Sequence, residues 1–153
     1  MLMFVENRWR KDQIPEIWET EEDKNLSDRE LKKINFKWAL GNIRGKTFFN
    51  KSTKQGIHVS RDGLSEWKNA TKSRDQALSV RLLSVLLEVA DYWKEGPHIP
   101  HDPNIEKVLY FRRHCKINGK NYTIVITVKA YKSQNYRKYY HHYLDDFLTE
   151  PKK

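Results

Sequence analysis

Residues 107–131 read KVLYFRRHCKI-NG-KNYTIVITVKAY and predict a β-hairpin. Both arms are rich in β-branched and aromatic residues, and Asn118-Gly119 is the preferred two-residue turn between such arms. Because the turn sets the register, facing pairs are counted outward from it. The largely apolar face, expected to pack on a helix, carries the pairs Cys115–Tyr122, Arg113–Ile124, Phe111–Ile126 and Leu109–Val128. The opposite, more polar face carries His114–Thr123, Arg112–Val125, Tyr110–Thr127 and Val108–Lys129.

The segment before the hairpin predicts the helix that covers its apolar face. Ser73-Arg-Asp-Gln76 is a capping-box sequence, and apolar residues then run from Ala77 to Trp93 over most of a helical circumference. Such a helix is buried, so we expect residues 77–93 to form the core helix beneath the sheet. Gly96-Pro97 is expected to end it.

The flanking segments complete an α+β fold. A second capping box, Ser27-Asp-Arg-Glu30, predicts a helix over residues 28–40. Short strands are expected at 47–49 and 56–59. Residues 136–144 are expected to form a further strand or a strand that leads into a short helix. We therefore expect an N-terminal helical part with a core helix packed on a curved antiparallel sheet. The expected organisation is an acidic arm over residues 1–26, one domain over 27–148 and a tail over 149–153.

The charge of the chain is high and uneven. Its 153 residues include 29 Lys and Arg against 20 Asp and Glu, for a net charge of +9. Residues 1–30 carry 5 basic and 9 acidic side chains, whereas residues 31–90 carry 12 and 4. An acidic arm on a basic body is typical of a domain that binds a polyanion, although a basic surface also serves solubility alone.

Several protein classes are excluded by what the sequence lacks. No apolar run reaches the ~20 residues of a membrane span, and the start does not resemble a secretory signal. We therefore expect a protein without membrane contact that is either cytoplasmic or exported by a route that needs no N-terminal signal. The lone Cys115 excludes an internal disulfide or a multi-cysteine metal cluster. Phosphate-binding, dinucleotide-binding, serine-hydrolase and zinc-protease motifs are absent. We expect no metal and no cofactor.

The polar face of the hairpin suggests metal-free RNA cleavage. In that reaction one imidazole takes the proton of a ribose 2′-OH, and a second acid protonates the leaving 5′-oxygen. Lys or Arg stabilises the phosphorane. Any hairpin with one face in solvent shows the same alternation, so the spacing alone leaves both interpretations open. Histidines elsewhere are further candidates. His58 lies in a strand, where it is either a base near the mouth of the sheet or an exposed side chain. His141 and His142 are adjacent, so one imidazole can face the sheet while the other faces away.

Aromatic side chains mixed with Lys and Arg in residues 131–143 fit RNA contact by base stacking and phosphate neutralisation. Tyrosines on an edge strand also cover cores, so this pattern too has two interpretations. The residues expected to hold an RNA strand are Lys68, Lys72, Tyr110, Arg137, Tyr139 and Tyr140.

Several segments together resemble the large polyvalent-protein-associated domains, which are grouped with the barnase–EndoU–colicin–RelE superfamily of RNases. They are KWALGNIRGK at 37–46, GIHVS at 56–60, the helix Leu78–Trp93, INGKNYTIVITVK at 117–129 and YYHHYL at 139–144. The resemblance covers residues 34–146 and implies a helical part followed by a curved antiparallel sheet whose open face holds the RNase site in active members. Val128-Lys129 and Tyr140-His141-His142 match recurring family positions, whereas Ala130 stands where an acidic residue is expected.

The resulting hypothesis is a metal-independent endoribonuclease domain of a phage, mobile-element or toxin system. His142 and His114 are the expected acid/base pair, with His58 in reserve; Lys129 and Arg112 would stabilise the phosphorane, and Thr127 would orient the phosphate. Changing His142 or Lys129 to Ala is then expected to remove cleavage with the melting temperature nearly unchanged. The expected partners are RNA, either tRNA or mRNA, and a cognate inhibitor or immunity protein; the oligomeric state is left open.

Two alternatives come from other classes of protein. The basic face would either bind nucleic acid without cutting it, or dock an acidic protein partner. A further hypothesis concerns residues 16–23: this acidic segment would cover the basic face and inhibit it, so that deletion of residues 1–26 raises RNA affinity.

Overall fold

The computed structural model describes residues 14–97, 103–132 and 136–146. The predicted tail, residues 149–153, lies outside this range, and the expected domain boundaries stay a prediction. The N-terminal half contains β1 (Glu16–Ile17), α2 (Glu21–Lys24), α3 (Asp28–Asn42), β2 (Thr47–Asn50), β3 (Gln55–His58) and α4 (Arg61–Ala70). The second half contains α5 (Arg74–Ser79), the 3-10 turn η1 (Val80–Leu82), α6 (Leu83–Val89), β4 (Asp91–Gly96), β5 (Ile105–Ile117), β6 (Lys120–Tyr131) and β7 (Arg137–Asp146).

The predicted hairpin is present as β5 and β6 with the predicted register. Cys115 faces Tyr122, His114 faces Thr123, and every other pair counted from the turn is confirmed. The two turn residues both have positive φ, 54° at Asn118 and 78° at Gly119, which a two-residue hairpin turn requires and which Asn and Gly tolerate. The turn chemistry therefore sets the register of the longest pair of strands.

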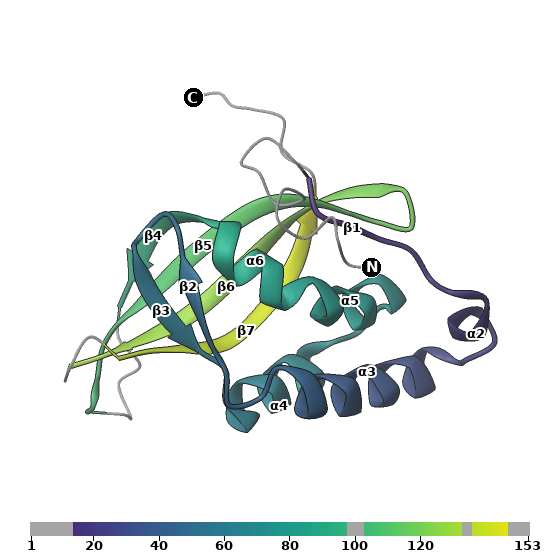
Figure 1. The fold of residues 1–153 in the computed structure, drawn as a ribbon, viewed down its shortest axis with the longest axis horizontal. Coiled ribbons are helices and arrows are strands. Elements are labelled where there is room, and N and C mark those ends of the chain that lie inside the picture. Colours follow the sequence, from purple (N-terminus) through teal and green to yellow (C-terminus); the bar gives the residue numbers. More distant parts are fainter. Residues whose placement is uncertain (1–13, 98–102, 133–135, 147–153) are drawn as a thin grey trace.

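The fold is α+β, as expected, with a curled sheet whose helices gather on one side (Figure 1). The strand order is β1-β5-β6-β7-β3-β2, and β4 also pairs with β5. The expected antiparallel sheet is in fact mixed, because β1 pairs parallel to β5 and β3 pairs parallel to β7. The buried core lies between the helices and the helix-facing side of β5, β6 and β7.

The predicted core helix over residues 77–93 is wrong in its extent. The buried segment begins one turn earlier, is interrupted by η1, and ends at Val89. Tertiary contacts end it: the Asn50 side-chain amide donates to the carbonyls of Leu87 and Ala90 at 2.8 and 2.9 Å. The Lys51 backbone N–H donates to the Glu88 carbonyl at 2.9 Å. Residues 91–96 continue as β4, so Trp93 lies on a strand.

Helix α4 occupies the segment that the sequence pattern left without an element. Ser60 caps its start by accepting from the Gly63 N–H. A side chain on Gly63 would collide with the backbone and ring of Tyr139, so this glycine permits the close approach of α4 to β7. The approach buries Trp67 and Tyr139, both 0% exposed.

The acidic arm is docked on the helices over its described part. Arg81 forms a two-bond ion pair with the buried Asp23 carboxylate, at 3.1 and 3.2 Å. Arg74 binds Glu19 in the same way, at 3.1 Å twice. Backbone hydrogen bonds from β5 to Pro15 and from Asn118 to Ile17 continue the attachment. Two acidic residues of the arm, Glu19 and Asp23, thus pair with arginines of the helical segment, away from the polar face of the hairpin.

Candidate functional site

Strands β5, β6 and β7 present two faces of opposite character. The inner face turns toward the helices and includes Phe111, Cys115, Ile124 and Ile126, all buried. The outer face carries the polar half of the hairpin register together with side chains of β7: Tyr110, Arg112, His114, Thr127, Lys129, Tyr140, His141 and Tyr143. Alternation along strands assigns each residue to its face, except at one irregularity in β7.

That irregularity is a β-bulge at Tyr140. Thr127 of β6 faces His141, but the next residue, Val128, faces Tyr139, which leaves Tyr140 as an extra residue in β7. A bulge re-aims the side chains beside it. Tyr139 is consequently 0% exposed on the inner face, whereas the rings of Tyr140 and His141 lie 4.6 Å apart on the outer one.

His142 belongs to the inner face and is 1% exposed. Ser79 Oγ donates to the Gln76 carbonyl at 2.6 Å, so toward His142 Nε2, at 2.7 Å, it accepts. The proton is therefore assigned to Nε2, and Nδ1 accepts from the Tyr139 hydroxyl at 2.7 Å. Trp67 stacks on the imidazole at 6.0 Å between ring centroids. Burial, followed by the neighbouring charge of His141, lowers the pKa of His142 to about 3.

The structure does not bring the predicted acid/base pair together. His114 is half-buried on the outer face opposite Thr123, whereas His142 lies beneath the sheet with both ring nitrogens hydrogen-bonded. His58 is separate from both: it lies on β3, where its Nδ1 is 3.1 Å from Thr47 Oγ1. The imidazole that shares the outer face with His114 is His141, the other member of the adjacent pair.

The bulge instead assembles a compact polar cluster on the outer face. Lys129 Nζ lies 4.0 Å from the ring centroid of Tyr140, and Thr127, in register with His141, has a buried Oγ1 without a hydrogen-bond partner among the described residues. Burial lowers the pKa of His141, the charge of the Glu66 carboxylate raises it in part, and the charge of Lys129 lowers it further. Burial and Glu66 both raise the pKa of Tyr140.

A second cluster lies where β4 joins β5. Trp93, 39% exposed, has the Arg112 guanidinium 4.4 Å and the Lys94 ammonium 4.3 Å from its ring centroid. Lys94 also lies 5.7 Å from the Tyr110 ring. Sequence reasoning missed Trp93 and Lys94 because it assigned residues 77–93 to a helix, and the β-forming character of Tyr92-Trp93 was the available signal.

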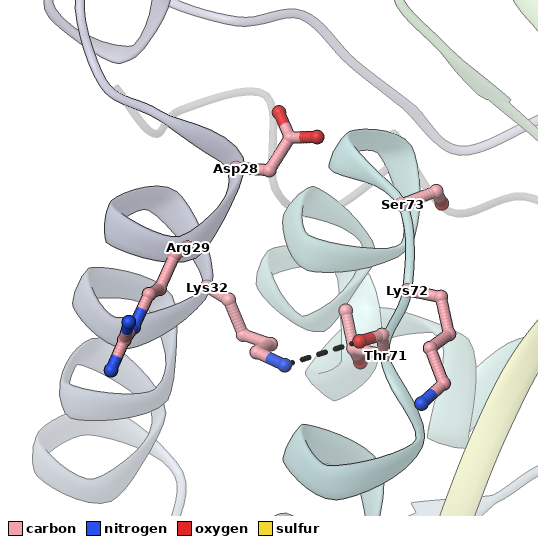
Figure 2. A pocket seen from close by; sticks show the side chains of 6 residues that line it. All are labelled: Asp28, Arg29, Lys32, Thr71, Lys72 and Ser73. Atoms are coloured by element: carbon pink, nitrogen blue, oxygen red, sulfur yellow. Dashed lines mark hydrogen bonds between the residues drawn. The ribbon is translucent and has the colours of Figure 1, made fainter.

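The remaining residues predicted to hold RNA are dispersed. Tyr139 is buried, and Arg137 faces Ala130 with its Nε buried and without a partner among the described residues. Lys68 lies in the helical layer, with its ammonium 4.8 Å from the Phe36 ring centroid. Lys72 lines a pocket between α3 and the linker that precedes α5 (Figure 2). The predicted single basic face is thus divided between the sheet and the helices.

Other chemistries find little support in the described part of the chain. Cys115 is buried on the inner face, and burial followed by the Asp75 charge raises the pKa of its thiol to about 12. In residues 14–97, 103–132 and 136–146 no three His, Cys, Asp or Glu side chains gather as a metal site requires. Over the same residues, no helix has the length and apolar character of a membrane span.

Comparison with known proteins places the folded body in a domain family. The model of the family described as large polyvalent protein-associated domain 3 matches residues 27–143, from the N-cap of α3 into β7. No curated protein and no solved structure matches the chain significantly. The match concerns the domain family, and the wider resemblance to the RNase superfamily stays a prediction.

Proposed function

For this chain, which belongs to the large polyvalent protein-associated domain 3 family, we propose a function as a nucleic-acid-binding module whose outer face binds single-stranded RNA. The observation that carries this proposal is the pairing of cations with aromatic rings at two places on that face. Lys129 lies over Tyr140, and Arg112 lies with Lys94 at Trp93. An aromatic ring can stack on a base while the cation beside it neutralises a phosphate.

The spacing of the two pairs suits an RNA strand running along the sheet. Arg112 faces Val125 in β6, and Lys129 lies four residues farther along that strand. Four residues of a strand span about 14 Å, enough for a few nucleotides between the two pairs. Tyr110 and Thr127 face each other in the interval, and the half-buried Tyr110 offers a further ring to the same RNA strand.

RNA binding is tested with a labelled single-stranded oligomer and the double variant Arg112→Gln/Lys129→Gln. The matched control, Lys33→Gln/Lys37→Gln, removes the same charge from exposed positions of α3. We expect the outer-face variant to bind at least about 10-fold more weakly. Because each single-strand phosphate contact contributes about 0.7 to the salt dependence, the slope of log K against log salt should fall by about 1.4. Equal losses in both variants would contradict the proposal.

A second candidate function, RNA cleavage, is favoured by the cluster at the bulge. A lowered pKa keeps His141 neutral near pH 7, so its imidazole can accept the 2′-OH proton. The 2′-oxygen would attack phosphorus, the bond to the 5′-oxygen would break, and Lys129 would stabilise the charge that develops. The 5′-oxygen must gain a proton in this step. The Tyr140 hydroxyl keeps its proton near pH 7, because burial and the Glu66 charge raise its pKa, and its ring lies 4.6 Å from the His141 ring, so Tyr140 is the residue to test for that transfer.

Cleavage is tested by incubating the protein with total tRNA and a labelled RNA in EDTA. The expected product carries a 2′,3′-cyclic phosphate, and His141→Gln should remove it with RNA binding retained. Tyr140→Phe tests the second proton transfer in the same assay, because it removes the hydroxyl and keeps the ring. RNA that is bound but uncut would leave the binding module as the function. RNA that is neither bound nor cut would favour an acidic protein partner, such as a cognate inhibitor, for the outer face.

A further inference from the structure

We infer that the surface where α3 meets α4 docks an acidic segment of a protein partner. The two helices lie side by side in the helical layer (Figure 1). The Phe36 ring of α3 has two cations of α4 beside it, with Arg61 Cζ 5.8 Å and Lys68 Nζ 4.8 Å from the ring centroid. These three residues define the α3–α4 surface, on which both cations border the same aromatic ring.

The cations of the α3–α4 surface have no acidic partner in the part of the chain that the structure describes. Neither Arg61 nor Lys68 forms an ion pair with a described residue. The acidic residues of α4 act on β7 instead, because Asp62 pairs with a lysine of that strand at 4.0 Å and the charge of Glu66 acts on its side chains. Across residues 28–72, 11 basic side chains stand against 4 acidic ones. An external acidic group can therefore neutralise this surface.

The spacing of the two cations matches a pair of arginines that already holds an acidic segment. The cations of the α3–α4 surface are seven residues apart in α4, so they lie on one side of the helix, about 10 Å apart along its axis. Arg74 and Arg81 are also seven residues apart, and each binds a carboxylate of the arm through two hydrogen bonds. Those carboxylates belong to Glu19 and Asp23, four residues apart in sequence. We therefore expect the partner to carry carboxylates at a similar spacing.

The aromatic ring of this surface favours a protein segment over RNA. Phe36 is half-buried and packs against the hydrophobic core, so its ring offers less area to a stacking base than Trp93 of the outer face, which is 39% exposed. A small apolar contact beside two cations suits an acidic helix that carries an apolar side chain, because such a helix binds through both kinds of contact. The helices and the outer face lie on opposite sides of the sheet (Figure 1), so both surfaces can be occupied together.

Docking is tested with a fluorescent alanine-based helical peptide that carries Glu at every fourth position, in about 0.15 M salt. We expect saturable binding with a dissociation constant of about 100 μM, and at least about 10-fold weaker binding to Arg61→Gln/Lys68→Gln. The variant Arg61→Lys/Lys68→Arg keeps both charges and should bind within about two-fold of the unaltered protein. The matched control, Lys33→Gln/Lys37→Gln, removes the same charge from exposed positions of α3 and should also stay within about two-fold.

Three results would overturn this inference: no saturable binding of the peptide, equal binding of a peptide with Gln in place of Glu, or an equal loss in both charge-removing variants. RNA is the competing ligand. If Arg61→Gln/Lys68→Gln weakens the binding of single-stranded RNA and leaves peptide binding unchanged, the surface binds nucleic acid and the inference is wrong. Failure of the outer-face proposal would appear in Arg112→Gln/Lys129→Gln as unchanged RNA affinity, and it would leave the peptide titration unaffected.

Discussion

Tyr139 and His142 lie three residues apart in β7, yet their side chains meet on the inner face, where the Tyr139 hydroxyl lies 2.7 Å from His142 Nδ1. In a regular strand, residues three apart point to opposite faces. The extra residue Tyr140 removes that alternation, because Thr127 faces His141 while Val128 faces Tyr139. One bulge therefore sends Tyr139 and His142 into the core and turns Tyr140 and His141 outward.

The first prediction concerns the stability of His142→Ala. The sequence suggested a catalytic imidazole whose removal would hardly alter the melting temperature. The structure predicts instead a loss of about 3 kcal/mol, because the change leaves a cavity under Trp67 and unpaired hydroxyls at Ser79 and Tyr139. Urea unfolding measures the loss. His58→Ala should cost less than about 1 kcal/mol, because the half-buried imidazole has a hydrogen bond to the exposed Thr47 hydroxyl and a ring contact with Tyr136 at 6.0 Å.

The second prediction is a pH dependence of stability. Burial holds the pKa of His142 near 3, whereas an unfolded histidine titrates near 6.5. Between these values the unfolded chain binds a proton that the folded chain does not, so stability is full above pH 6.5 and falls as the pH decreases toward 3. The expected slope is about 1.4 kcal/mol per pH unit from this residue. Measurements of the free energy of unfolding from pH 7 to pH 4 should show this slope, and His142→Gln should reduce it. An unchanged slope in His142→Gln would contradict its attribution to His142.

The third prediction concerns the ion pair between Asp23 and Arg81. Its side chains are 6% and 22% exposed, and the guanidinium also donates to Asn35 at 2.7 Å. Removing one partner of such a pair leaves an uncompensated charge, so Asp23→Asn should cost about 3 kcal/mol. Glu21→Gln is the control, since its carboxylate is 91% exposed; it should change stability by less than about 0.5 kcal/mol. Similar losses in both variants would contradict a structural role for the pair.

The same ion pair bears on the hypothesis of self-inhibition. Deletion of residues 1–26 removes Asp23 and Glu19, the partners of Arg81 and Arg74. We therefore expect the truncated protein to unfold at a lower temperature than the full chain. The RNA affinity of the truncated protein should be measured only at temperatures at which circular dichroism shows that it is folded. The double variant Glu21→Gln/Glu22→Gln in the full chain tests the effect of acidic charge alone. Higher RNA affinity in that double variant would support self-inhibition.

A fourth prediction compares two glycine-to-alanine changes. Gly119 has a φ of +78° in the hairpin turn, and a side chain there would also meet Trp18. Gly119→Ala should therefore destabilise the protein by about 1 kcal/mol or more. Gly41 lies in α3 with nothing near the position of an added side chain, so Gly41→Ala should stabilise by about 0.5 to 1 kcal/mol. Thermal unfolding of both variants should show shifts of opposite sign.

The elements predicted correctly are those whose signals are local. Asn118-Gly119 determines the turn and, through it, every facing pair between β5 and β6. The Ser27–Glu30 capping box forms as the sequence indicates, with both of its hydrogen bonds present. The Ser73–Gln76 box forms only in part: the Ser73 hydroxyl accepts from the Gln76 N–H, but the Gln76 side chain binds the backbone of His142 and Leu144 instead.

The amino-acid sequence by itself determined the α+β class, the hairpin register and the start of α3, because these depend on neighbours within a few residues. Tertiary structure decided where the core helix ends and which histidine faces solvent. Asn50 ends α6 from another element, and a bulge against β6 selects His141 rather than His142 for the outer face. The end of α6 and the position of the bulge both depend on contacts between residues distant in sequence. The alternation of side chains within one strand gives no sign of a bulge that arises from pairing with the neighbouring strand.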